Sequence, residues 1–277
     1  MPARRVRGTI VVVTGASSGI GRATATEFAK AGASVVVAGR RKERLDELVG
    51  EITSTGGEAL GVPADVSDQE QVEALIDQAR GHFGRVDTLI NNAGIGIAAP
   101  FAEQSIDDFQ RVMDTNFWGA VYACRAVLPV MRSQDSGGLI VNVSSILGKR
   151  GVPYETAYCA SKFALAGFSE ALRTEVMSEL IDVTTVFPGL VETEIFDSAN
   201  NQTGLEMPDI VPKMPAQELA RLLVQNALLP QPEIVMALDA QAINFVNTLA
   251  PGLLDVMMGQ GLPFIEGFRR GAASSGS

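Results

Sequence analysis

Short runs rich in β-branched residues alternate along this chain with longer segments whose apolar residues recur at helical spacing. The predicted strands are residues 10–13, 34–38, 58–63, 88–91, 138–143 and 182–187, with a further candidate at 232–236. The segment after the second strand shows the helical pattern at Leu45, Leu48, Val49 and Ile52. Because parallel strands are joined by crossover helices, the alternation predicts an α/β fold, a doubly wound parallel sheet with helices on both faces.

The predicted organisation is a single domain followed by an apolar C-terminal extension. Residues 1–239 form the domain, since nothing resembling a linker interrupts the alternation before about residue 191. Within the domain, residues 194–215 are rich in Asn, Gly and Pro, which predicts a mobile lid over the substrate. Residues 240–277 form the extension, which ends in a Gly- and Ser-rich tail that we expect to fray.

Residues 240–254 of the extension carry no charged side chain, so this segment needs an apolar partner. Three roles fit: lining the substrate pocket, packing on a second subunit, or peripheral contact with a membrane surface. The membrane role is the least favoured, because residues 240–267 lack the Lys and Arg that interfacial helices direct at lipid headgroups. No run of about 18 consecutive apolar residues is present, so we expect no transmembrane helix.

Composition excludes several function classes. The 22 Lys and Arg against 32 Asp and Glu give a net charge of −10, which disfavours nucleic acid as a partner. Two cysteines and one histidine exclude a disulfide framework and a His-based metal cluster, so no metal is expected. Residues 9–13 are too short an apolar run for a signal peptide, although arginines precede them. We therefore expect a cytoplasmic protein.

A glycine-rich turn joins the first predicted strand to the helix after it, with the spacing Gly15-x3-Gly19-x-Gly21. Glycines let the chain turn tightly and let the backbone approach a pyrophosphate, which the free amides of the helix N-terminus would bind. The alternative is an ordinary strand-to-helix turn, and the strand before and helix after it favour the cofactor site. The candidate cofactor-binding residues here are Gly15, Ser17, Ser18, Gly19, Ile20 and Gly21.

Four cations follow the second predicted strand, at Arg40, Arg41, Lys42 and Arg44. In a doubly wound fold this point faces the adenosine ribose, where a carboxylate would bind the 2′-hydroxyl and an arginine would bind a 2′-phosphate. Gly39 supplies no carboxylate, so Arg40 and Arg41 predict NADP(H) in preference to NAD(H). The alternative is a solvated basic turn that opens the next helix.

A tyrosine and a lysine stand four residues apart at Tyr158 and Lys162, on a predicted helix, and Ser145 ends the strand before it. The spacing places both side chains on one helix face. We expect the lysine charge to favour the phenolate and to lower the tyrosine pKa towards a value useful for proton transfer. The pattern alone also fits a surface pair, and its combination with the two earlier motifs favours catalysis.

With these motifs the sequence resembles the short-chain dehydrogenase/reductase family, which has the Rossmann fold. The matching pattern is Thr14-Gly15-x3-Gly19-x-Gly21, Asn91-Asn92-Ala93-Gly94, Asn116, Ser145, Tyr158-x3-Lys162 and Pro188-Gly189-x-Val191-x-Thr193. The resemblance covers about the first 195 residues, in the family's order.

The resemblance implies a role for each catalytic candidate. Tyr158 would be the general acid in carbonyl reduction and the base in alcohol oxidation. Lys162 would bind the nicotinamide ribose as well as lower the tyrosine pKa, and Ser145 would hydrogen-bond the substrate oxygen. Asn116 would hold a water that connects Lys162 to solvent.

The resemblance also implies further cofactor contacts. Asp65 and Val66 would contact adenine. Asn91, Asn92, Ala93 and Gly94 would line the adenosine side of the cofactor and buttress the sheet, with Asn92, Ala93 and Gly94 as the cofactor-binding candidates. Pro188, Gly189, Val191 and Thr193 would enclose the nicotinamide.

The predicted function is an NADP(H)-dependent oxidoreductase that interconverts a ketone or aldehyde and an alcohol by hydride transfer. A small to medium apolar substrate is expected from the apolar residues Leu147, Val152, Pro153, Leu190, Ile195 and Phe196. The alternatives are an NAD-dependent alcohol dehydrogenase, a non-catalytic NADP-binding sensor and a scaffold whose tail recruits a partner. The family resemblance implies a homodimer or homotetramer.

Overall fold

The computed structural model describes residues 5–192, 195, 213–236, 252 and 255–256. The strands within these ranges form one sheet of seven, in the order β3-β2-β1-β4-β5-β6-β7, and every neighbouring pair is parallel. Their bounds are β1 Ile10–Thr14, β2 Ser34–Gly39, β3 Glu58–Pro63, β4 Thr88–Asn91, β5 Gly138–Val143, β6 Ile181–Phe187 and β7 Glu233–Val235. The predicted doubly wound parallel sheet is confirmed.

The hydrophobic runs predicted the strand positions correctly because the central strands are buried on both faces. All residues of β1, β4 and β5 are buried, as expected for strands covered by helices above and below. The bounds of β3, β4 and β5 are those predicted, while β1, β2 and β6 each extend one residue further. The strand expected at residues 232–236 is confirmed as the shorter edge strand β7.

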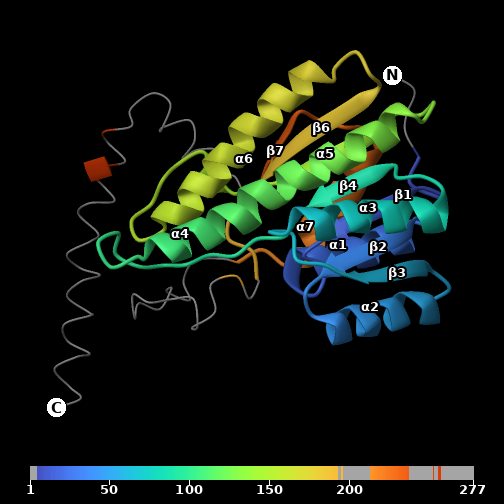
Figure 1. Ribbon diagram of the computed structural model, residues 1–277, viewed down its shortest axis with the longest axis horizontal. Helices are drawn as coiled ribbons and strands as arrows, with labels where there is room; N and C mark the ends of the chain where they lie inside the picture. The colour runs from blue at the N-terminus through green and yellow to red at the C-terminus, as the bar shows by residue number, and fades with distance from the viewer. Residues whose placement is uncertain (1–4, 193–194, 196–212, 237–251, 253–254, 257–277) are drawn as a thin grey trace.

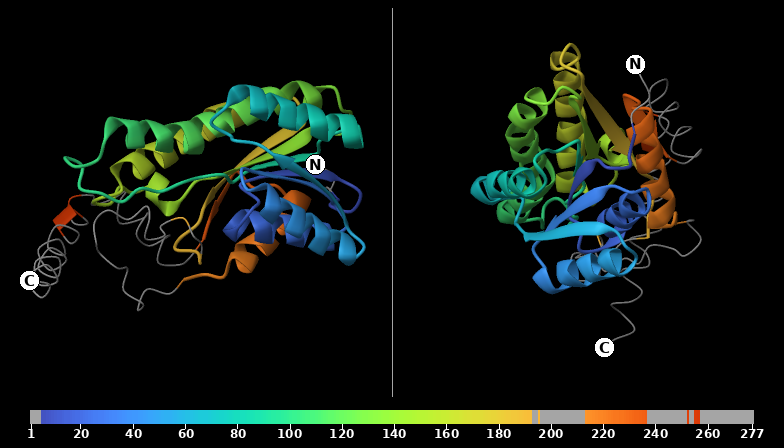
Figure 2. Two further views of the ribbon diagram at one scale, coloured as in Figure 1. Left: turned by 60° about the horizontal axis from the view of Figure 1, so that its bottom comes forward. Right: turned by 90° about the vertical axis from the view of Figure 1, so that its right-hand side faces the viewer.

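Helices cover the sheet in two layers (Figures 1 and 2). The helices α1 (Gly19–Lys30), α2 (Lys42–Ser54) and α7 (Ala216–Leu228) share one apolar core with the sheet. The helices α3 (Gln69–Phe83), α5 (Gly119–Arg132) and α6 (Thr156–Glu175) share the other. Successive side chains along a strand point to opposite faces of the sheet, so Val11 of β1 packs in the first core and Val12 in the second.

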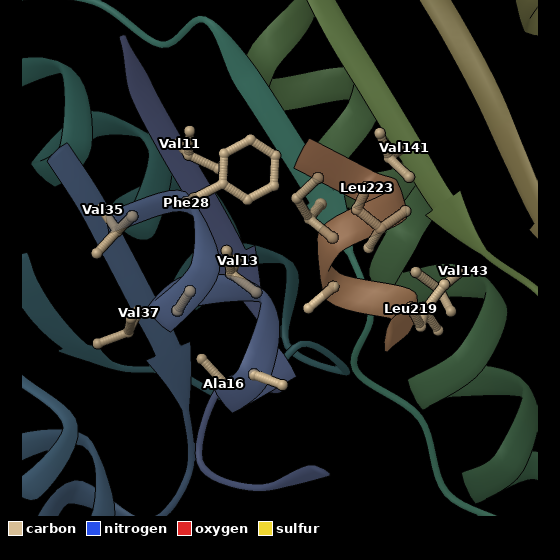
Figure 3. Close-up of a cluster of buried hydrophobic side chains, with 14 of the residues drawn as sticks. Val11, Val13, Ala16, Phe28, Val35, Val37, Val141, Val143, Leu219 and Leu223 are labelled. Carbon is tan, nitrogen blue, oxygen red and sulfur yellow. The ribbon is translucent and has the colours of Figure 1, made fainter. Parts of the chain in front are cut away.

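The core under α1 and α7 is formed by one aromatic ring and many branched aliphatic side chains. Figure 3 shows Phe28 of α1 between Val11 of the sheet and Leu223 of α7. Phe28, Leu219 and Leu223 are each fully buried. Each such side chain contributes roughly 1.5–3 kcal/mol by leaving water, so this core holds α1, and the turn that precedes it, firmly on the sheet.

Two short irregular helices lie at the carboxyl edge of the sheet. A π-helical turn, η1 (Asp114–Trp118), separates α4 (Ile106–Met113) from α5. A 3₁₀ turn, η2 (Ile146–Gly148), follows β5. Because strand order reverses between β1 and β4, the loops after these two strands diverge at this edge, where doubly wound folds bind ligands.

Buried amides connect the middle of the sheet to α6. Asn91 Nδ2 donates to Asn142 Oδ1 at 2.8 Å, and Asn142 Nδ2 donates to Ser169 Oγ at 2.8 Å. Cys124 Sγ lies 3.4 Å from Asn91 Nδ2, and burial raises the pKa of this thiol to about 12. The polar groups are therefore paired inside the core, and they fix β4, β5 and α6 relative to one another.

Most of the predicted lid and extension lies outside the described residues. Of the lid, residues 195 and 213–215 are described, and Met214 forms a parallel bridge with Val191. Of the extension, residues 252, 255 and 256 are described, and Asp255 pairs with Arg150. The predicted domain boundary at residue 239 falls in an undescribed range. Within the described ranges, every helix is too short or too polar to cross a membrane.

Candidate active site

The glycine-rich turn lies at the carboxyl end of β1 and leads directly into α1. Gly15 and Gly19 have φ of +65° and +51°, values that favour glycine. A Cβ on Gly21 would lie 2.3 Å from the Gly15 carbonyl oxygen, and one on Gly15 would lie 2.7 Å from Ala93 Cα. The turn is thus packed too closely for side chains at these positions, which leaves backbone amides at the start of α1.

The segment after β4 holds this turn in place. The Thr14 hydroxyl accepts from the backbone amides of Asn92 at 3.0 Å and Ala93 at 3.1 Å. Asn92 Nδ2 donates to the carbonyl oxygens of Thr14 at 3.0 Å and Gly15 at 3.3 Å. The structure therefore brings two predicted site segments, 15–21 and 92–94, into direct contact.

Of the two candidate arginines, Arg41 lies against the glycine-rich turn. Its Nη2 is 2.7 Å from Ser18 Oγ and 3.0 Å from Ser17 Oγ. Arg40 extends outward instead, with 69% of its side chain exposed, and its Nη1 is 3.9 Å from Asp65 Oδ2. Of the two arginines, Arg41 is therefore the one placed to contact a phosphate at the turn.

Asp65 and Val66 lie beside this arginine pair. The Asp65 carboxylate accepts from the amide of Ser67 at 3.0 Å and from its hydroxyl at 2.7 Å. Val66 is buried, and a Cβ on Gly119 at the start of α5 would be 2.8 Å from Val66 Cγ2. The two residues therefore form a fixed wall between the turn and α5.

The side chains of Ser145, Tyr158 and Lys162 come together after β5 and on α6. All three are buried, with 9%, 5% and 3% exposure. The Ser145 hydroxyl hydrogen-bonds the Tyr158 phenol. Lys162 Nζ donates to the Val143 carbonyl oxygen at 2.8 Å and lies 5.6 Å from the centre of the tyrosine ring. The predicted cluster is thus assembled at the carboxyl edge of the sheet.

Burial controls the protonation of this cluster. It raises the pKa of the Tyr158 phenol well above its ordinary value, against the smaller effect of the Ser145 hydrogen bond. It lowers the pKa of Lys162 to about 8. The expectation that the lysine lowers the tyrosine pKa is wrong for this structure, because the loss of hydration on burial is the largest effect on the phenol and raises its pKa.

Asn116 lies in the π-helical turn and faces Lys162 across Gly94. Its Oδ1 accepts from the Ile95 amide at 2.8 Å, and its Nδ2 donates to Ser161 Oγ at 3.0 Å and to the Ile95 carbonyl at 2.9 Å. A Cβ on Gly94 would be 3.3 Å from Asn116 Oδ1 and 3.6 Å from Lys162 Nζ. The asparagine side chain thus joins the loop after β4 to α6.

Residues after β6 complete the described part of the site. The Pro188 carbonyl accepts from the amide of Ile146 at 2.9 Å, which places this segment beside the Ser145 loop. Gly189 follows it, and Val191 is buried at its bridge with Met214. Thr193 lies outside the described residues. Nearly all the site residues predicted from sequence therefore gather at one edge of the sheet.

Two serines support the cluster; the sequence indicated Ser144 only as the structural neighbour of Ser145, and it gave Ser161 no role. Ser144 donates to the Lys162 carbonyl at 2.9 Å, and a Cβ on Gly148 would be 2.5 Å from that hydroxyl. Ser161 Oγ donates to the Tyr158 carbonyl at 2.7 Å. Ser161 stands immediately before Lys162, so its position was visible, but nothing local indicated that it would connect Tyr158 to Asn116.

Comparison with known proteins identifies the family. The short chain dehydrogenase model matches residues 9–204, well over half of the chain. The chain belongs to this family. Relatives similar in sequence include the uncharacterized oxidoreductase YxnA of Bacillus subtilis. It is 34% identical over 259 residues, which are 92% of this chain and 72% of that protein. Another is 11-beta-hydroxysteroid dehydrogenase A of Sesamum indicum, 37% identical over 234 residues, 80% of this chain and 66% of that protein.

Solved structures of other proteins show the same fold. A Burkholderia phymatum member in complex with NAD has a TM-score of 0.82 and 28% identity, over 90% of this chain and 96% of that one. An alcohol dehydrogenase from Thermococcus sibiricus, complexed with 5-hydroxy-NADP, has a TM-score of 0.74 and 26% identity, over 83% and 96%. This chain is accordingly an oxidoreductase that acts on CH–OH donors with NAD(P).

The residues at the carboxyl edge of the sheet fit such a dinucleotide. The glycines of the turn stand where Cβ atoms would collide with the backbone, so the backbone itself forms the binding surface. The N-terminus of α1 adds free amides and a partial positive charge, which suit a pyrophosphate. Among the described residues, no group of three His, Cys, Asp or Glu side chains is arranged to hold a metal ion.

Proposed function

We propose that this short-chain dehydrogenase is an NADP(H)-dependent oxidoreductase that interconverts a ketone or aldehyde and an alcohol by hydride transfer, with Tyr158 as the general acid and base. The observation that carries the proposal is the buried cluster of Ser145, Tyr158 and Lys162, beside a glycine-rich turn that Arg41 flanks. In this arrangement the cofactor supplies the hydride, and the chain supplies orientation and the proton.

Proton transfer is assigned to the Tyr158 hydroxyl. Its raised pKa keeps the phenol protonated at neutral pH, which is the form that carbonyl reduction needs. Ser145, already hydrogen-bonded to this phenol, is positioned to share a substrate oxygen with it. The two hydroxyls would then orient the carbonyl and stabilise the negative charge that develops on its oxygen.

Lys162 and Asn116 support the tyrosine. With a pKa lowered to about 8, the lysine can carry its charge or release a proton near neutral pH. Its position over the tyrosine ring suits it to bind ribose hydroxyls and to restore the proton that Tyr158 gives up. Asn116 holds the loop after β4 against α6, so it keeps the lysine surroundings fixed.

Preference for NADP(H) is proposed from the Arg41 geometry. Two serine hydroxyls already orient its guanidinium beside the turn, and a guanidinium binds a phosphate through paired hydrogen bonds. Gly39 at the end of β2 provides no carboxylate for a ribose 2′-hydroxyl. Since the solved relatives include complexes with NAD and with an NADP derivative, the fold itself accommodates either cofactor.

A small to medium apolar carbonyl compound is the proposed substrate. Val152 and Leu190 are half-buried in the loops around the cluster, and Val191 behind them is buried. Relatives named as hydroxysteroid dehydrogenases favour an alicyclic framework.

We further propose a cytoplasmic homodimer or homotetramer, in which the exposed rings of Trp118 and Phe163 on the outer helical layer would be covered.

The test is consumption of NADPH and NADH over a panel of ketones and aldehydes, with Tyr158→Phe as control. Turnover with NADPH that disappears in the variant supports the proposal. Preference for NADH would overturn the cofactor assignment and favour an NAD-dependent alcohol dehydrogenase. Cofactor binding without turnover of any compound would favour a non-catalytic sensor instead.

A further inference from the structure

A half-buried glutamate, whose Oε2 atom is buried, lies one helical turn before the tyrosine and plays no part in the mechanism above. Glu155 precedes α6 at its N-cap position, where acidic side chains commonly accept hydrogen bonds from the first helix amides. The Glu155 side chain makes no such bond. Its Oε2 is buried and has no hydrogen-bond partner within the part of the chain that the structure describes.

A second buried polar atom lies beside the start of α6. Gln104 Oε1 accepts from the Thr156 hydroxyl at 3.1 Å, which fixes this amide next to the residue that follows Glu155. Gln104 Nε2, the donor end of the same amide, is buried and likewise has no partner among the described residues. An acceptor and a donor are thus both held without partners at one end of the helix.

The backbone around these two groups is fixed. The loop that carries Gln104 is tied to the segment before α6 by the Ala99 amide, which donates to the Tyr154 carbonyl at 2.9 Å. The backbone N–H of Gln104 donates to the Pro100 carbonyl oxygen at 3.1 Å. Ile97 of this loop packs with residues of α4 and α6, and Figure 1 shows α4 beside the beginning of α6.

The Glu155 carboxyl lies within electrostatic reach of the reacting groups. A charge on it raises the pKa of the Tyr158 phenol and of the neighbouring Cys159 thiol. Burial raises the pKa of Glu155 itself to about 7, because its surroundings solvate the charged form poorly. A carboxyl in such a place lowers folding stability unless a ligand gives its oxygen a hydrogen bond.

We propose that Glu155 and Gln104 bind a hydroxyl group of the substrate that is separate from the reacting carbonyl. A hydroxyl donates one hydrogen bond and accepts others, so it can donate to Glu155 Oε2 and accept from Gln104 Nε2. The preferred substrate class is then a hydroxyketone, or the corresponding diol, on an apolar framework. This inference rests on the proposed function, since it assumes that Tyr158 and Ser145 hold the carbonyl.

The experiment compares ketones in pairs that differ only in a second hydroxyl. The probes are cyclohexanone and the analogue with a hydroxyl across the ring, decalone and hydroxydecalone, and a monoketo steroid with and without a hydroxyl at its far end. Initial rates with saturating NADPH give kcat and KM for wild type, Glu155→Leu and Gln104→Leu. Glu170→Gln is the matched control, because Glu170 is an exposed carboxylate on the same helix.

The expected result is that wild type prefers the hydroxylated member of at least one pair by about tenfold to a hundredfold in kcat/KM, mainly through KM. Glu155→Leu should reduce this preference to about twofold or less while retaining turnover of the unsubstituted ketone. Gln104→Leu should reduce it partly, and the Glu170 control should not change it.

Other results would overturn the inference. If wild type prefers neither member of any pair, or if Glu155→Leu keeps the preference, the carboxyl does not bind the substrate. Equal loss of activity on both members, with a lowered melting temperature, would assign Glu155 a structural role instead. Failure of wild type to reduce any ketone with either cofactor is a separate result, which would overturn the proposed function on which this inference depends.

Discussion

Replacing Arg41 by Ala tests whether the guanidinium beside the glycine-rich turn selects the cofactor. Arg41 Nη2 lies 2.7 Å from Ser18 Oγ and 3.0 Å from Ser17 Oγ. Because these hydrogen bonds already order the side chain, binding a phosphate costs it little further conformational entropy. A hydrogen bond to a charged group contributes roughly 1.5–3 kcal/mol, and each 1.4 kcal/mol changes an affinity about tenfold. The KM for NADPH should therefore rise about 10- to 100-fold.

The same change should leave NADH almost unaffected, because NADH has no 2′-phosphate. Arg40→Ala is the matched control. Arg40 is 69% exposed and pairs with Asp65 at 3.9 Å, and such exposed ion pairs contribute about 0.2–1 kcal/mol, so its effect on NADPH should stay below about fivefold.

The assay is initial-rate kinetics with each cofactor varied at a fixed ketone concentration. If Arg41→Ala loses NADPH and NADH binding to the same degree, the arginine only supports the turn and does not select the cofactor. A larger effect from Arg40 than from Arg41 would also contradict this role for Arg41, and would assign the phosphate to the outward-facing arginine.

Three further predictions concern packing and charge. Gly21→Ala should abolish cofactor binding, measured by fluorescence titration, because its Cβ would lie 2.3 Å from the Gly15 carbonyl oxygen. Asn142→Leu should lower the free energy of unfolding by roughly 3 kcal/mol in urea titrations, because it leaves the buried Asn91 amide without its 2.8 Å acceptor. Stability of the cofactor-free protein should fall as pH rises from about 4.5 to 7, because burial raises the pKa of Glu155 and the folded state binds more protons in that window than the unfolded state.

Each of these predictions has a control or a contrary outcome. Gly50→Ala should bind cofactor normally, because a Cβ there meets no atom within 4 Å. Wild-type stability in Asn142→Leu would show that water replaces the lost amide. The pH dependence of stability should be smaller in Glu155→Leu, and an unchanged profile would mean that other groups cause it.

The strands and the glycine-rich turn could be predicted because their determinants are local. The β-branched runs of β1 and β5 are buried on both faces, so they contain few polar residues and stand out in the sequence. Gly15 and Gly19 are favoured by their positive φ and Gly21 by its contact with the Gly15 carbonyl, which are conditions set within the turn, although Gly15 also packs against the distant Ala93. Patterns of this kind need no knowledge of distant parts of the chain.

Side-chain partners across elements could not be predicted in the same way. The four-residue spacing of Tyr158 and Lys162 correctly placed them on one helix, but the sign of the tyrosine pKa shift depends on how deeply other elements bury both groups. Both arginines were candidates, and the serines of a different loop position Arg41. Glu155 was missed because a carboxyl at a helix start is normally an exposed cap.

In the proposed mechanism the Tyr158 hydroxyl supplies the proton for carbonyl reduction. The most direct measurement compares wild type and Tyr158→Phe in two assays on the same preparation, NADPH binding by fluorescence titration and NADPH oxidation with a ketone that wild type reduces. We expect the variant to bind NADPH with unchanged affinity and to turn over at least about a hundredfold more slowly. Turnover close to the wild-type rate in the variant would contradict this mechanism, because the proton would then come from another group.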